Sequence, residues 1–375
     1  MKLQDLAYGL LAVGLSTTAS CAEPGPSERV SAESVRYWGM CDASAAVALD
    51  RETLLVADDE RNVLQIYPAD RSGGPLQSIP WDRQLDIPAD DEHPEADIEG
   101  ATVLDGRIYW ISSHGRSRKG KWRENRHRFF AMTVAKTQDG FTAQPFGTPC
   151  KTLILDLVRD PRMRALGLAE ALDFGKKEVP ALAPKTEGLN VEGLCATADG
   201  RSLLIALRNP LHEGKAILVP LLNPAAVLLQ EARPDFGDPI ELRLAALVDG
   251  AVVGLGVRSI EYSASHGAYL LVAGPADSTS TFALYRWSGE RDDPPELLQR
   301  ATERIGRIDD FAPEALIVDP DRKDVQLLSD DGSLKVKVAS PRECAEGTYE
   351  DGWCEAKYLL DDTRKTFRGI RIDLE

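Results

Sequence analysis

The chain has 375 residues, of which 43% are hydrophobic and 6% aromatic, so it can bury a large core in one large domain or two ordinary ones. Sixty acidic residues stand against 44 basic ones, and the formal net charge is −16. This balance favours solubility and cation binding, and it weighs against nonspecific association with nucleic acid or an anionic membrane surface. A duplex DNA partner is therefore not expected.

Residues 1–20 have the features of an export signal, with Lys2, an apolar stretch from Leu6 to Leu15 and small residues just before Cys21. The stretch is too short for a comfortable membrane span, and no later segment offers about 18 uninterrupted apolar residues. Cys21 at the predicted cleavage point resembles a bacterial lipoprotein box. We therefore expect an exported bacterial protein, periplasmic or anchored to the membrane through a lipid on Cys21. The alternative is ordinary cleavage nearby, which leaves Cys21 as a thiol.

Residues 21–35 are rich in Pro, Ser and Glu and indicate a flexible tether, and residues 36–375 are expected to form one domain. In that domain short β-like runs alternate with turn signals. The early runs are Ala45–Leu49, Thr53–Ala57, Val63–Tyr67, Ala101–Leu104, Arg107–Ser112 and Phe129–Val134. Aspartate-glycine turns at Asp105-Gly106, Asp199-Gly200 and Asp249-Gly250 are expected at the first bend of a repeated unit.

One local pattern recurs where a glutamate begins a β-like run. The three clear copies are Asp97-Ile98-Glu99-Gly100-Ala101, Asn190-Val191-Glu192-Gly193-Leu194 and Ala312-Pro313-Glu314-Ala315-Leu316, and weaker copies surround Ser44 and Glu261. The anchor positions 44, 99, 192, 261 and 314 are separated by 55, 93, 69 and 53 residues, which suits four-stranded propeller blades with loop insertions. The predicted fold is an all-β β-propeller; five blades are favoured, and the 93-residue gap leaves room for a sixth.

That long gap contains a segment with a different period. Between residues 151 and 185 the apolar residues recur at spacings of three and four, which predicts one or two short helices broken near Asp160-Pro161. This helical insertion could be a lid over a ligand site or a cover for an exposed edge, and cover is slightly favoured. After Glu314 the runs Glu314–Val318, Val325–Ser329, Tyr358–Asp361 and Ile370–Leu374 provide one more blade, whose last strand could close the ring against the N-terminal blade.

The repeat predicts a site, because equivalent residues on the innermost strands of a propeller converge on its axis. Glu99, Glu192, Glu261 and Glu314 would then form a ring of carboxylates. Carboxylates gathered in a partly dry channel need a cation or shifted pKa values. Oxygen ligands select a hard divalent cation, with Ca²⁺ favoured. The alternatives are that these glutamates only accept structural hydrogen bonds, or act as acid or base without a metal.

The end of the second strand of each blade should lie on the same face, about 14 to 17 residues after the anchor. Those positions hold Asp58-Asp59, Ser113-His114-Gly115-Arg116, Arg208-Asn209-Pro210 and Asp330-Asp331. A basic run begins there with Arg116, Arg118 and Lys119, and together with Arg208 and Asn209 it is a candidate clamp for an anion. A solvated hairpin tip is the alternative. His114 could serve as a general acid or base, or could be a hydrogen-bonded structural residue.

The five cysteines after Cys21 also give expectations. Cys344 and Cys354 bracket a short polar segment and are the best candidates for a disulfide. Cys195 is expected to be a small buried core residue, and Cys41 and Cys150 could pair. No Cys or His spacing resembles a zinc site.

Several segments together resemble the bacterial family called domain of unknown function 3616, over most of residues 38–375. They are Met40-Cys41-Asp42-Ala43-Ser44-Ala45, Asp97-Ile98-Glu99-Gly100, Ser113-His114-Gly115-Arg116, Asn190-Val191-Glu192-Gly193-Leu194, Arg208-Asn209-Pro210 and Phe311-Ala312-Pro313-Glu314-Ala315. This resemblance implies kinship and no activity. A looser similarity runs to the esterase-like phytases, with acid-glycine-leucine repeats, and to gluconolactonase-type propellers, in which a Glu-Gly-Pro glutamate binds the catalytic metal. That similarity implies that Glu99 and Glu192 are metal ligands, although Ala101 and Leu194 replace the proline.

The leading functional hypothesis is an exported, monomeric propeller with a divalent cation in its channel that acts on an anionic small molecule, by phosphoester hydrolysis. Glu99, Glu192 and His114 are the expected catalytic residues, and Arg116, Arg118, Lys119, Arg208 and Asn209 the expected substrate-binding residues. The first alternative is a noncatalytic, surface-tethered binding or scaffold propeller. A further alternative is a lactone or ester hydrolase.

Overall fold

The computed structural model describes residues 34–88, 90–184, 187–277, 281–320 and 322–374. The chain divides into a unit from Met1 to Ala32 and a second unit from Glu33 to Glu375. The predicted export signal, Cys21 and the tether up to residue 33 lie outside the described residues. The first strand, β1, begins at Ser34, two residues before the expected start of the domain. Among the described residues, no helix is both long enough and apolar enough to cross a membrane.

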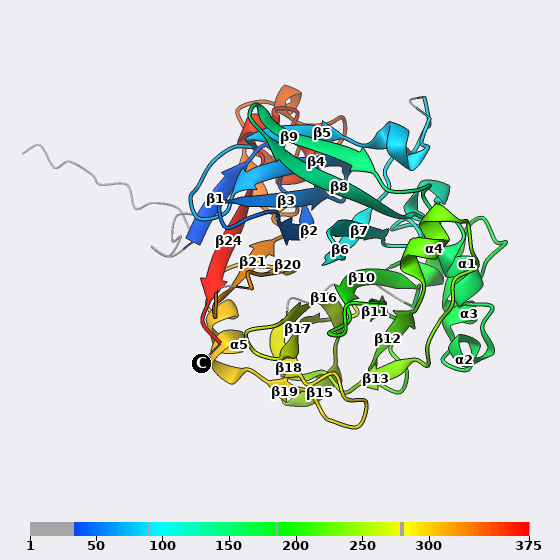
Figure 1. Ribbon diagram of the computed structural model, residues 1–375. Helices are drawn as coiled ribbons and strands as arrows, with labels where there is room; N and C mark the ends of the chain where they lie inside the picture. Colours follow the sequence, from blue (N-terminus) through cyan, green and yellow to red (C-terminus); the bar gives the residue numbers. More distant parts are fainter. Residues whose placement is uncertain (1–33, 89, 185–186, 278–280, 321, 375) are drawn as a thin grey trace, which may run out of the picture. The chain divides into compact units, whose positions relative to one another are not determined.

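The described residues form five four-stranded antiparallel sheets, arranged as the blades of a propeller (Figure 1). From the inside outward, blade 1 is β2 (Ala43–Ala48), β3 (Thr53–Asp58), β4 (Arg61–Pro68) and β5 (Gln77–Pro80); blade 2 is β6 (Ile98–Leu104), β7 (Arg107–Ser112), β8 (Phe129–Thr137) and β9 (Gly140–Pro145); blade 3 is β10 (Asn190–Ala196), β11 (Leu203–Asn209), β12 (Ala216–Leu221) and β13 (Ile240–Leu242); blade 4 is β16 (Gly256–Ser263), β17 (Ala268–Gly274), β18 (Ala283–Trp287) and β19 (Glu296–Leu297); blade 5 is β20 (Pro313–Val318), β21 (Val325–Ser329), β24 (Thr366–Ile372) and β1 (Ser34–Trp38). The prediction of a five-bladed all-β propeller is confirmed.

The innermost strands make a closed ring, because each contacts the next in the order β2, β6, β10, β16, β20 and back to β2. The ring is closed within blade 5, where β1 pairs antiparallel with β24, so Ser34 lies opposite Ile370. The N-terminal strand thus supplies the outer edge of the last blade. The final strand, β24, was expected to close the ring against the N-terminal blade; it is instead the third strand of blade 5 and pairs there with the N-terminal strand β1.

Every innermost strand carries a β-bulge at the same position. The register with the second strand shifts around Ser44, Glu99, Glu192, Arg258 and Glu314, one residue in each blade. A bulge leaves one extra residue unpaired and re-aims its side chain. The repeated sequence pattern is therefore the signature of a bulge that presents one side chain per blade.

The residue after the bulge is small because neighbouring inner strands approach closely there. A Cβ atom added to Gly100 would lie 2.9 Å from Ile111 and 3.0 Å from the backbone nitrogen of Leu194. One added to Gly193 would lie 2.8 Å from the Ala206 side chain. Real Cβ atoms essentially never come within 3.0 Å, so the glycine of the Glu-Gly pairs is required by packing.

The helical insertion forms three short helices, α1 (Leu153–Leu157), α2 (Pro161–Arg164) and α3 (Leu168–Leu172). The predicted break is confirmed, since the Asp160 side chain caps α2 by accepting from the Arg162 backbone. Apolar residues of all three helices are buried in one core cluster with strands of blades 2 and 3. The insertion thus covers those blades, and it replaces the sixth blade that the long gap could have held.

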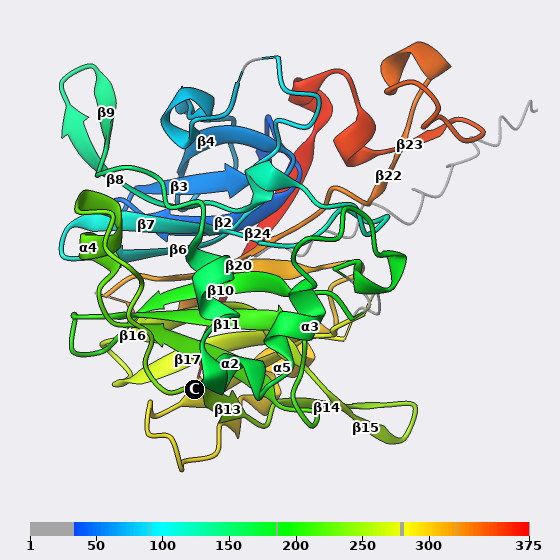
Figure 2. The same ribbon diagram turned by 90° about the vertical axis from the view of Figure 1, so that its right-hand side faces the viewer.

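The remaining elements lie outside the blades. They are α4 (Pro224–Leu229), α5 (Gln299–Ile305), the hairpins β14 (Ala245–Val248) with β15 (Ala251–Gly254) and β22 (Lys335–Lys337) with β23 (Trp353–Glu355), and 3₁₀ turns at Asp82–Leu85, Glu124–Arg126, Pro180–Leu182, Pro341–Glu343, Ala356–Tyr358 and Asp362–Arg364. Asp249-Gly250 turns the hairpin β14–β15, not a blade, and Tyr358–Asp361 is no strand, so both expectations were wrong. In Figure 2 both hairpins extend on the same side of the domain.

Candidate functional site

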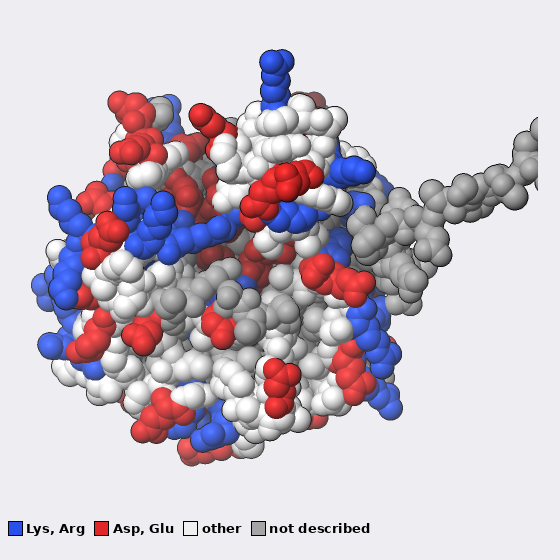
Figure 3. Space-filling view, turned by 180° about the vertical axis from the view of Figure 1, so that it is seen from behind, with Lys and Arg blue, Asp and Glu red and all other residues white. Residues whose placement is uncertain are grey.

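On one face of the domain the ends of four second strands meet the starts of the inner strands. The second strands end at Asp58, Ser112, Asn209 and Ser329, and each end pairs with the start of an inner strand close to the bulge. The predicted convergence of these positions with the anchors is therefore confirmed. Figure 3 looks onto the face that carries the β22–β23 hairpin, and acidic side chains are visible in a central hollow with basic side chains along its edge.

Arginines neutralise two of the glutamates at the bulges, Glu192 and Glu314. Arg208 donates from Nη1 to Glu192 at 2.9 Å, and Arg258 donates from its own Nη1 to the same oxygen at 3.1 Å. Arg258 also forms an ion pair with Glu314. All four side chains are buried, so the two positive charges are fixed beside the two negative ones. Glu192 and Glu314 thus have their charges compensated without a metal ion.

The bulge position of blade 4 corrects the sequence prediction. The bulge falls between Val257 and Ser259, so Arg258 is the residue equivalent to Glu99 and Glu192. The expected anchor, Glu261, lies three residues further along β16, about 10 Å at the usual rise per residue. The ring therefore contains an arginine where a fourth glutamate was expected. The search for an internal repeat missed Arg258, because the nearby sequence Ser259-Ile260-Glu261 resembles the repeat but is shifted along the strand.

Glu261 is held separately from this ring. Its carboxylate accepts a hydrogen bond from Thr102 Oγ1 at 3.2 Å. Burial raises the pKa of Glu261 to about 8, against the opposing effect of that hydrogen bond. The metal-ligand role predicted for Glu261 stays a prediction, and the contact with Thr102 does not support it.

The side of the channel formed by blades 1 and 2, called the acidic half below, carries the carboxylates of Asp42, Asp59, Glu60, Asp97 and Glu99. Asp59, Asp97 and Glu99 each offer an oxygen, and the three oxygens lie within 4.8 Å of one another. Asp97 forms an ion pair with Arg126 at 2.8 Å and accepts a hydrogen bond from Ser113. Glu99 is 9% exposed and has no hydrogen bond or ion pair with any residue in the described part of the chain. This triplet could hold a cation.

A second triplet shares one member with the first. Oxygens of Asp42, Asp59 and Glu60 also lie within 4.8 Å of one another. Asp42 is buried and accepts from the Cys41 thiol at 3.0 Å. Glu60 binds the Lys357 ammonium through Oε1 at 2.8 Å. Asp59 is thus common to both groups, and its Oδ1 is buried without a hydrogen-bond partner among the described residues.

The electrostatics of the acidic half favour a bound cation. Burial raises the pKa of Glu99 well above its ordinary value, and the charges of Glu192 and Asp97 add to this. Burial and the charges of Asp42 and Glu99 do the same to the pKa of Asp59. Burial raises the pKa of Asp97 to about 7. A positive ion at this point would allow all these groups to ionise together.

The donor set fits a hard ion. All five groups are carboxylates, which Ca²⁺ and Mg²⁺ prefer over the nitrogen and sulfur ligands of zinc. Two oxygens on one Ca²⁺ at about 2.3–2.6 Å can be at most about 5 Å apart, so triplets whose oxygens lie within 4.8 Å are compatible with a shared ion. Ca²⁺ takes six to eight ligands, so main-chain oxygen, water or substrate would supply the others.

Arg116 is engaged by the backbone, so its substrate-binding role stays a prediction that its contacts do not support. Its guanidinium donates to four backbone carbonyl oxygens, those of Gly120, Lys176, Leu172 and Asp173, at 2.9–3.1 Å. Two of these carbonyls lie at the C-terminal end of α3, where a positive charge is favoured. Arg116 therefore fastens the helical insertion to the end of β7.

Arg208 and Asn209 are also engaged by the backbone. Arg208 donates to the carbonyls of Pro275 and Asp277 as well as to Glu192, and Asn209 Nδ2 donates to the Ala276 carbonyl at 3.0 Å. Their substrate-binding roles stay predictions that these contacts do not support. Arg118 and Lys119 are exposed and remain available to a ligand.

His114 is buried beside a second histidine that the sequence did not single out. The Nδ1 atoms of His114 and His127 lie 3.3 Å apart, and His127 stacks on Trp122 with ring centroids 4.1 Å apart. Burial lowers the pKa of His114 well below its ordinary value and that of His127 to about 3. Both rings are therefore neutral at pH 7. Within the described residues, no contact joins His114 to the acidic triplets, so its catalytic role stays a prediction.

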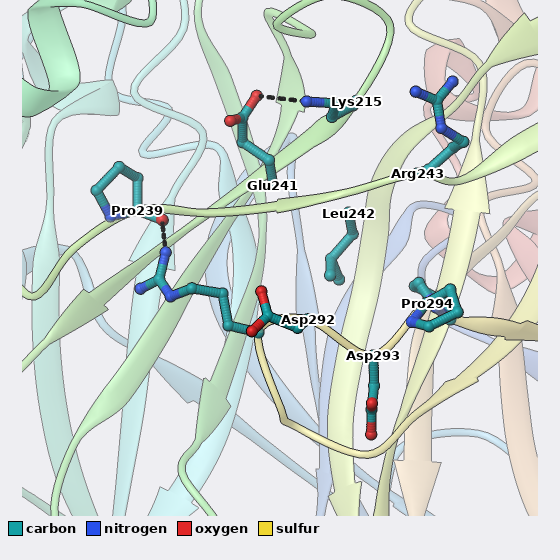
Figure 4. A pocket seen from close by; sticks show the side chains of 10 residues that line it. Lys215, Pro239, Glu241, Leu242, Arg243, Asp292, Asp293 and Pro294 are labelled. Atoms are coloured by element: carbon teal, nitrogen blue, oxygen red, sulfur yellow. Dashed lines mark hydrogen bonds and ion pairs between the residues drawn. The ribbon is translucent and has the colours of Figure 1, made fainter.

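A separate pocket of about 330 Å³ lies on the outer side of blades 3 and 4 (Figure 4). Glu241 and Lys215, 3.6 Å apart, lie on one side of it, and Asp292 and Asp293 on the other. Its lining residues come from β13 and the residues that flank it, from Lys215 just before β12, and from the β18–β19 connection, not from the inner strands. It is therefore distinct from the axial site.

The comparison with family models gives one match, to the family described as "Protein of unknown function (DUF3616)", over residues 42–139 and 153–312. These ranges cover more than half of the chain. The chain belongs to this family. Both triplets lie inside the matched residues, and the DUF3616 family description assigns them no role. No curated protein matches the sequence.

Among solved structures, the chain is similar to Myxococcus xanthus glutaminyl cyclase at 10% identity, with a TM-score of 0.39 over 78% of this chain and 88% of that one. It is similar to the PQQ-bound aldose sugar dehydrogenase of Streptomyces coelicolor, at 10% identity with a TM-score of 0.37 over 91% and 99%. A putative glucose dehydrogenase from Thermus thermophilus gives 9% identity and a TM-score of 0.38 over 90% and 98%. At these values no activity is transferred to this chain.

Sequence reasoning found Glu99 and the Asp58-Asp59 rim, but it missed Asp42, Glu60 and Asp97 as candidate ligands. A signal was present, because Asp42 and Asp97 each stand two residues before the bulge residue of their blade. Residues two apart in a strand share a face, so Asp42 and Asp97 could have been expected on the same side as the bulge residue of their blade.

Proposed function

We propose that the protein binds a divalent cation, with Ca²⁺ favoured, in the acidic half of its channel and there hydrolyses an anionic small molecule, a phosphoester. The observation that carries the proposal is Glu99. It is 9% exposed, has no partner among the described residues, and lies with Asp59 and Asp97 in one group of oxygens. A buried carboxylate without a partner is costly to fold, and a functional ligand explains why it is kept.

The cation would polarise a phosphoryl oxygen and lower the pKa of a water molecule. The protein would supply the remaining groups. Arg118 and Lys119 are exposed at the rim, and Arg118 is close enough to Lys357 to act on it electrostatically. These side chains would attract and orient the negative charge of the substrate. Arg116 and Arg208 are left out of this role because both guanidinium groups already donate to backbone carbonyls, and Arg208 donates to Glu192 as well.

Export and anchoring also belong to the proposal. The sequence of residues 1–21 supports an exported protein, periplasmic or attached through a lipid at Cys21, and the acidic composition gives no support for a nucleic-acid partner. A monomer is proposed. In an extracytoplasmic compartment a Ca²⁺ site can be weak and still be filled.

The test is calorimetric titration of the chelator-treated full-length protein with Ca²⁺, Mg²⁺ and Mn²⁺, for wild type and Glu99→Gln. Glu296→Gln is the matched control, because Glu296 is an exposed carboxylate paired with Arg286 on the outside of blade 4. The proposal expects cation binding at the Glu99 site, which Glu99→Gln abolishes or weakens at least tenfold and which Glu296→Gln leaves unchanged; binding at any other site is not part of this comparison. A phosphoester and lactone screen with the bound ion then follows.

Three outcomes separate the alternatives. Cation-dependent phosphoester turnover that disappears in Glu99→Gln supports the proposal. Cation binding without turnover of either substrate class replaces it with a noncatalytic, cation-dependent binding module. Absence of cation binding in the wild type refutes it and leaves the carboxylates with a structural role.

A further inference from the structure

The candidate ligands form two separate triplets of carboxylate oxygens. Asp59, Asp97 and Glu99 form one set of mutually close oxygens, and Asp42, Asp59 and Glu60 form the other. Only Asp59 belongs to both. A single ion cannot easily collect ligands from both sets, whereas a carboxylate has two oxygens and can bind one ion with each.

We infer that the channel holds two divalent cations bridged by Asp59, an inner one at Asp59, Asp97 and Glu99 and an outer one at Asp42, Asp59 and Glu60. This inference rests on the proposed function and deepens it. In two-metal hydrolytic sites the ions lie about 3.5–4 Å apart and stabilise both the attacking and the leaving oxygen of a displacement. The substrate class that fits is a phosphoester.

Unpartnered buried oxygens support both positions. Glu99, nine-tenths buried, has no partner among the described residues and belongs to the inner set. Asp59 Oδ1 is buried and has no hydrogen-bond partner among the described residues. In the outer set the Asp42 side chain is 4% exposed, and within the described part of the chain its carboxylate accepts a hydrogen bond only from the Cys41 thiol, to Oδ2. Lys357 occupies one oxygen of Glu60 and leaves the other for an ion.

The formal charge also matches two ions better than one. The carboxylates that act on one another here are Asp42, Asp59, Glu60, Asp97, Glu99 and Asp330. Their fixed counter-charges are Lys357 and Arg126, so when all six carboxylates are ionised, as a bound cation allows, six negative charges against two positive ones leave a formal charge of −4. Arg126 is shared with Glu95, so the deficit is at least this large. One divalent cation would leave two negative charges or more in a largely buried site.

The remaining buried charges nearby do not alter this balance. Asp58 is paired with Arg61 at 2.9 Å. Asp331 is paired with Arg368 at 2.7 Å. Across the channel, two arginines face Glu192 and Glu314. The deficit is therefore localised at the two triplets.

The experiment counts ions in the full-length protein. Mn²⁺ and Ca²⁺ are the probes, the stoichiometry is measured by calorimetry and by elemental analysis after desalting, and Mn²⁺ is also followed by electron paramagnetic resonance. The variants are Glu99→Gln for the inner position, Asp42→Asn for the outer one and Asp59→Asn for the bridge, with Glu296→Gln as control. Circular dichroism of each metal-free variant verifies that it is folded.

The inference expects two ions per chain in the wild type and in Glu296→Gln, with a magnetically coupled Mn²⁺ pair. Glu99→Gln and Asp42→Asn should each retain one ion and show the spectrum of an isolated Mn²⁺, and Asp59→Asn should weaken both positions at least tenfold. A wild type with one ion that Glu99→Gln removes overturns this inference and leaves the proposed function standing. Two ions that persist in Asp42→Asn also overturn it. No ion in the wild type overturns both.

Discussion

Arg258 Nε lies 2.9 Å from Glu192 Oε2, and this contact joins blade 4 to the neighbouring blade 3. Both side chains come from equivalent bulges on adjacent inner strands. The repeat therefore places opposite charges side by side in one half of the ring. Glu99 occupies the same bulge in blade 2, and among the described residues no arginine makes a hydrogen bond or ion pair with it. The ring thus contains one part in which arginines compensate the glutamates and another in which the carboxylate of Glu99 has no such partner.

Arg258→Met should be strongly destabilising. It removes the charge that compensates both Glu192 and Glu314 while keeping most of the side-chain volume. Breaking a buried ion pair by removing one partner costs about 3–5 kcal/mol, because a buried charge is left uncompensated. Chemical denaturation at pH 7 should show this loss in the free energy of unfolding. Arg286→Met, which removes a surface pair with Glu296, is the control and should change stability by no more than about 1 kcal/mol. Equal effects would contradict the structural role of Arg258.

Glu99→Gln should have effects of opposite sign with and without a cation. In chelator the variant is expected to be at least as stable as the wild type, because Glu99 has no partner to lose among the described residues and burial raises its pKa. In saturating Ca²⁺ the wild type should gain about 2.7 kcal/mol at a free concentration one hundred times the Kd, and the variant should gain less. Thermal unfolding of both proteins in chelator and in Ca²⁺ measures whether the order of their stabilities reverses. A variant that is less stable than wild type in chelator would show that Glu99 has a structural partner.

The fold was accessible from the sequence because the bulge motif recurs at a spacing that only a propeller blade fits, and short strands such as Thr53–Asp58 and Arg107–Ser112 are bounded by clear turns. The site was accessible only in part. Blade 4 carries Arg258 at the bulge, a residue whose charge is opposite to that of the glutamates in other blades. The repeat pattern therefore predicted the nearby Glu261 as the anchor of this blade. The engagement of Arg116 by carbonyls of α3 depends on how an insertion more than 50 residues away folds back, which no local pattern encodes.

Stability should fall with rising pH through the titration of Glu261. Burial raises the pKa of this group to about 8 in the folded protein, above the ordinary glutamate value near 4.5. Between those values the folded state keeps a proton that the unfolded state releases, so the contribution is complete at low pH and is lost toward pH 8, with a limiting slope of about 1.4 kcal/mol per pH unit. Denaturation of wild type and Glu261→Gln from pH 5 to 9 tests this. The difference between them should shrink toward pH 5 and be constant above pH 8; a constant difference at all pH values would contradict it.

Arg116→Lys should make the helical insertion less firmly held and should not change the binding of anions. A lysine cannot reproduce the planar fork that binds the carbonyls of Gly120, Leu172, Asp173 and Lys176. Hydrogen exchange should increase in residues 160–178, and phosphate binding to the cation-loaded protein should not change. The matched variant Arg118→Gln should weaken phosphate binding several-fold and leave exchange in the insertion unchanged. The reverse pattern would restore the original expectation that Arg116 is an anion clamp.

Cys344 and Cys354 should form a disulfide under oxidising conditions, as the sequence predicted. In the structure they are free thiols, but both are buried in one small cluster and share a side-chain hydrogen bond. Burial, aided by that bond, raises the pKa of Cys344 to about 11, so exchange at neutral pH should be slow. With oxidised glutathione as electron acceptor, the two thiols lose two protons and two electrons and the Sγ atoms join. Cys41 and Cys150 contact Asp42 and Thr152, respectively, and no contact within the described residues joins them.

Closing this short loop should stabilise the segment that carries Lys357, the partner of Glu60, by about 3 kcal/mol in the loop-entropy model. Intact mass and thiol titration before and after reduction measure the bond, and the double variant Cys344→Ser with Cys354→Ser should lose it together with the gain in stability. Cys150→Ser serves as control, because Cys150 lies in a different part of the domain, next to Phe129. If wild type oxidised with glutathione retains all its thiols, or if the mass shift persists in the double variant, the pairing is wrong.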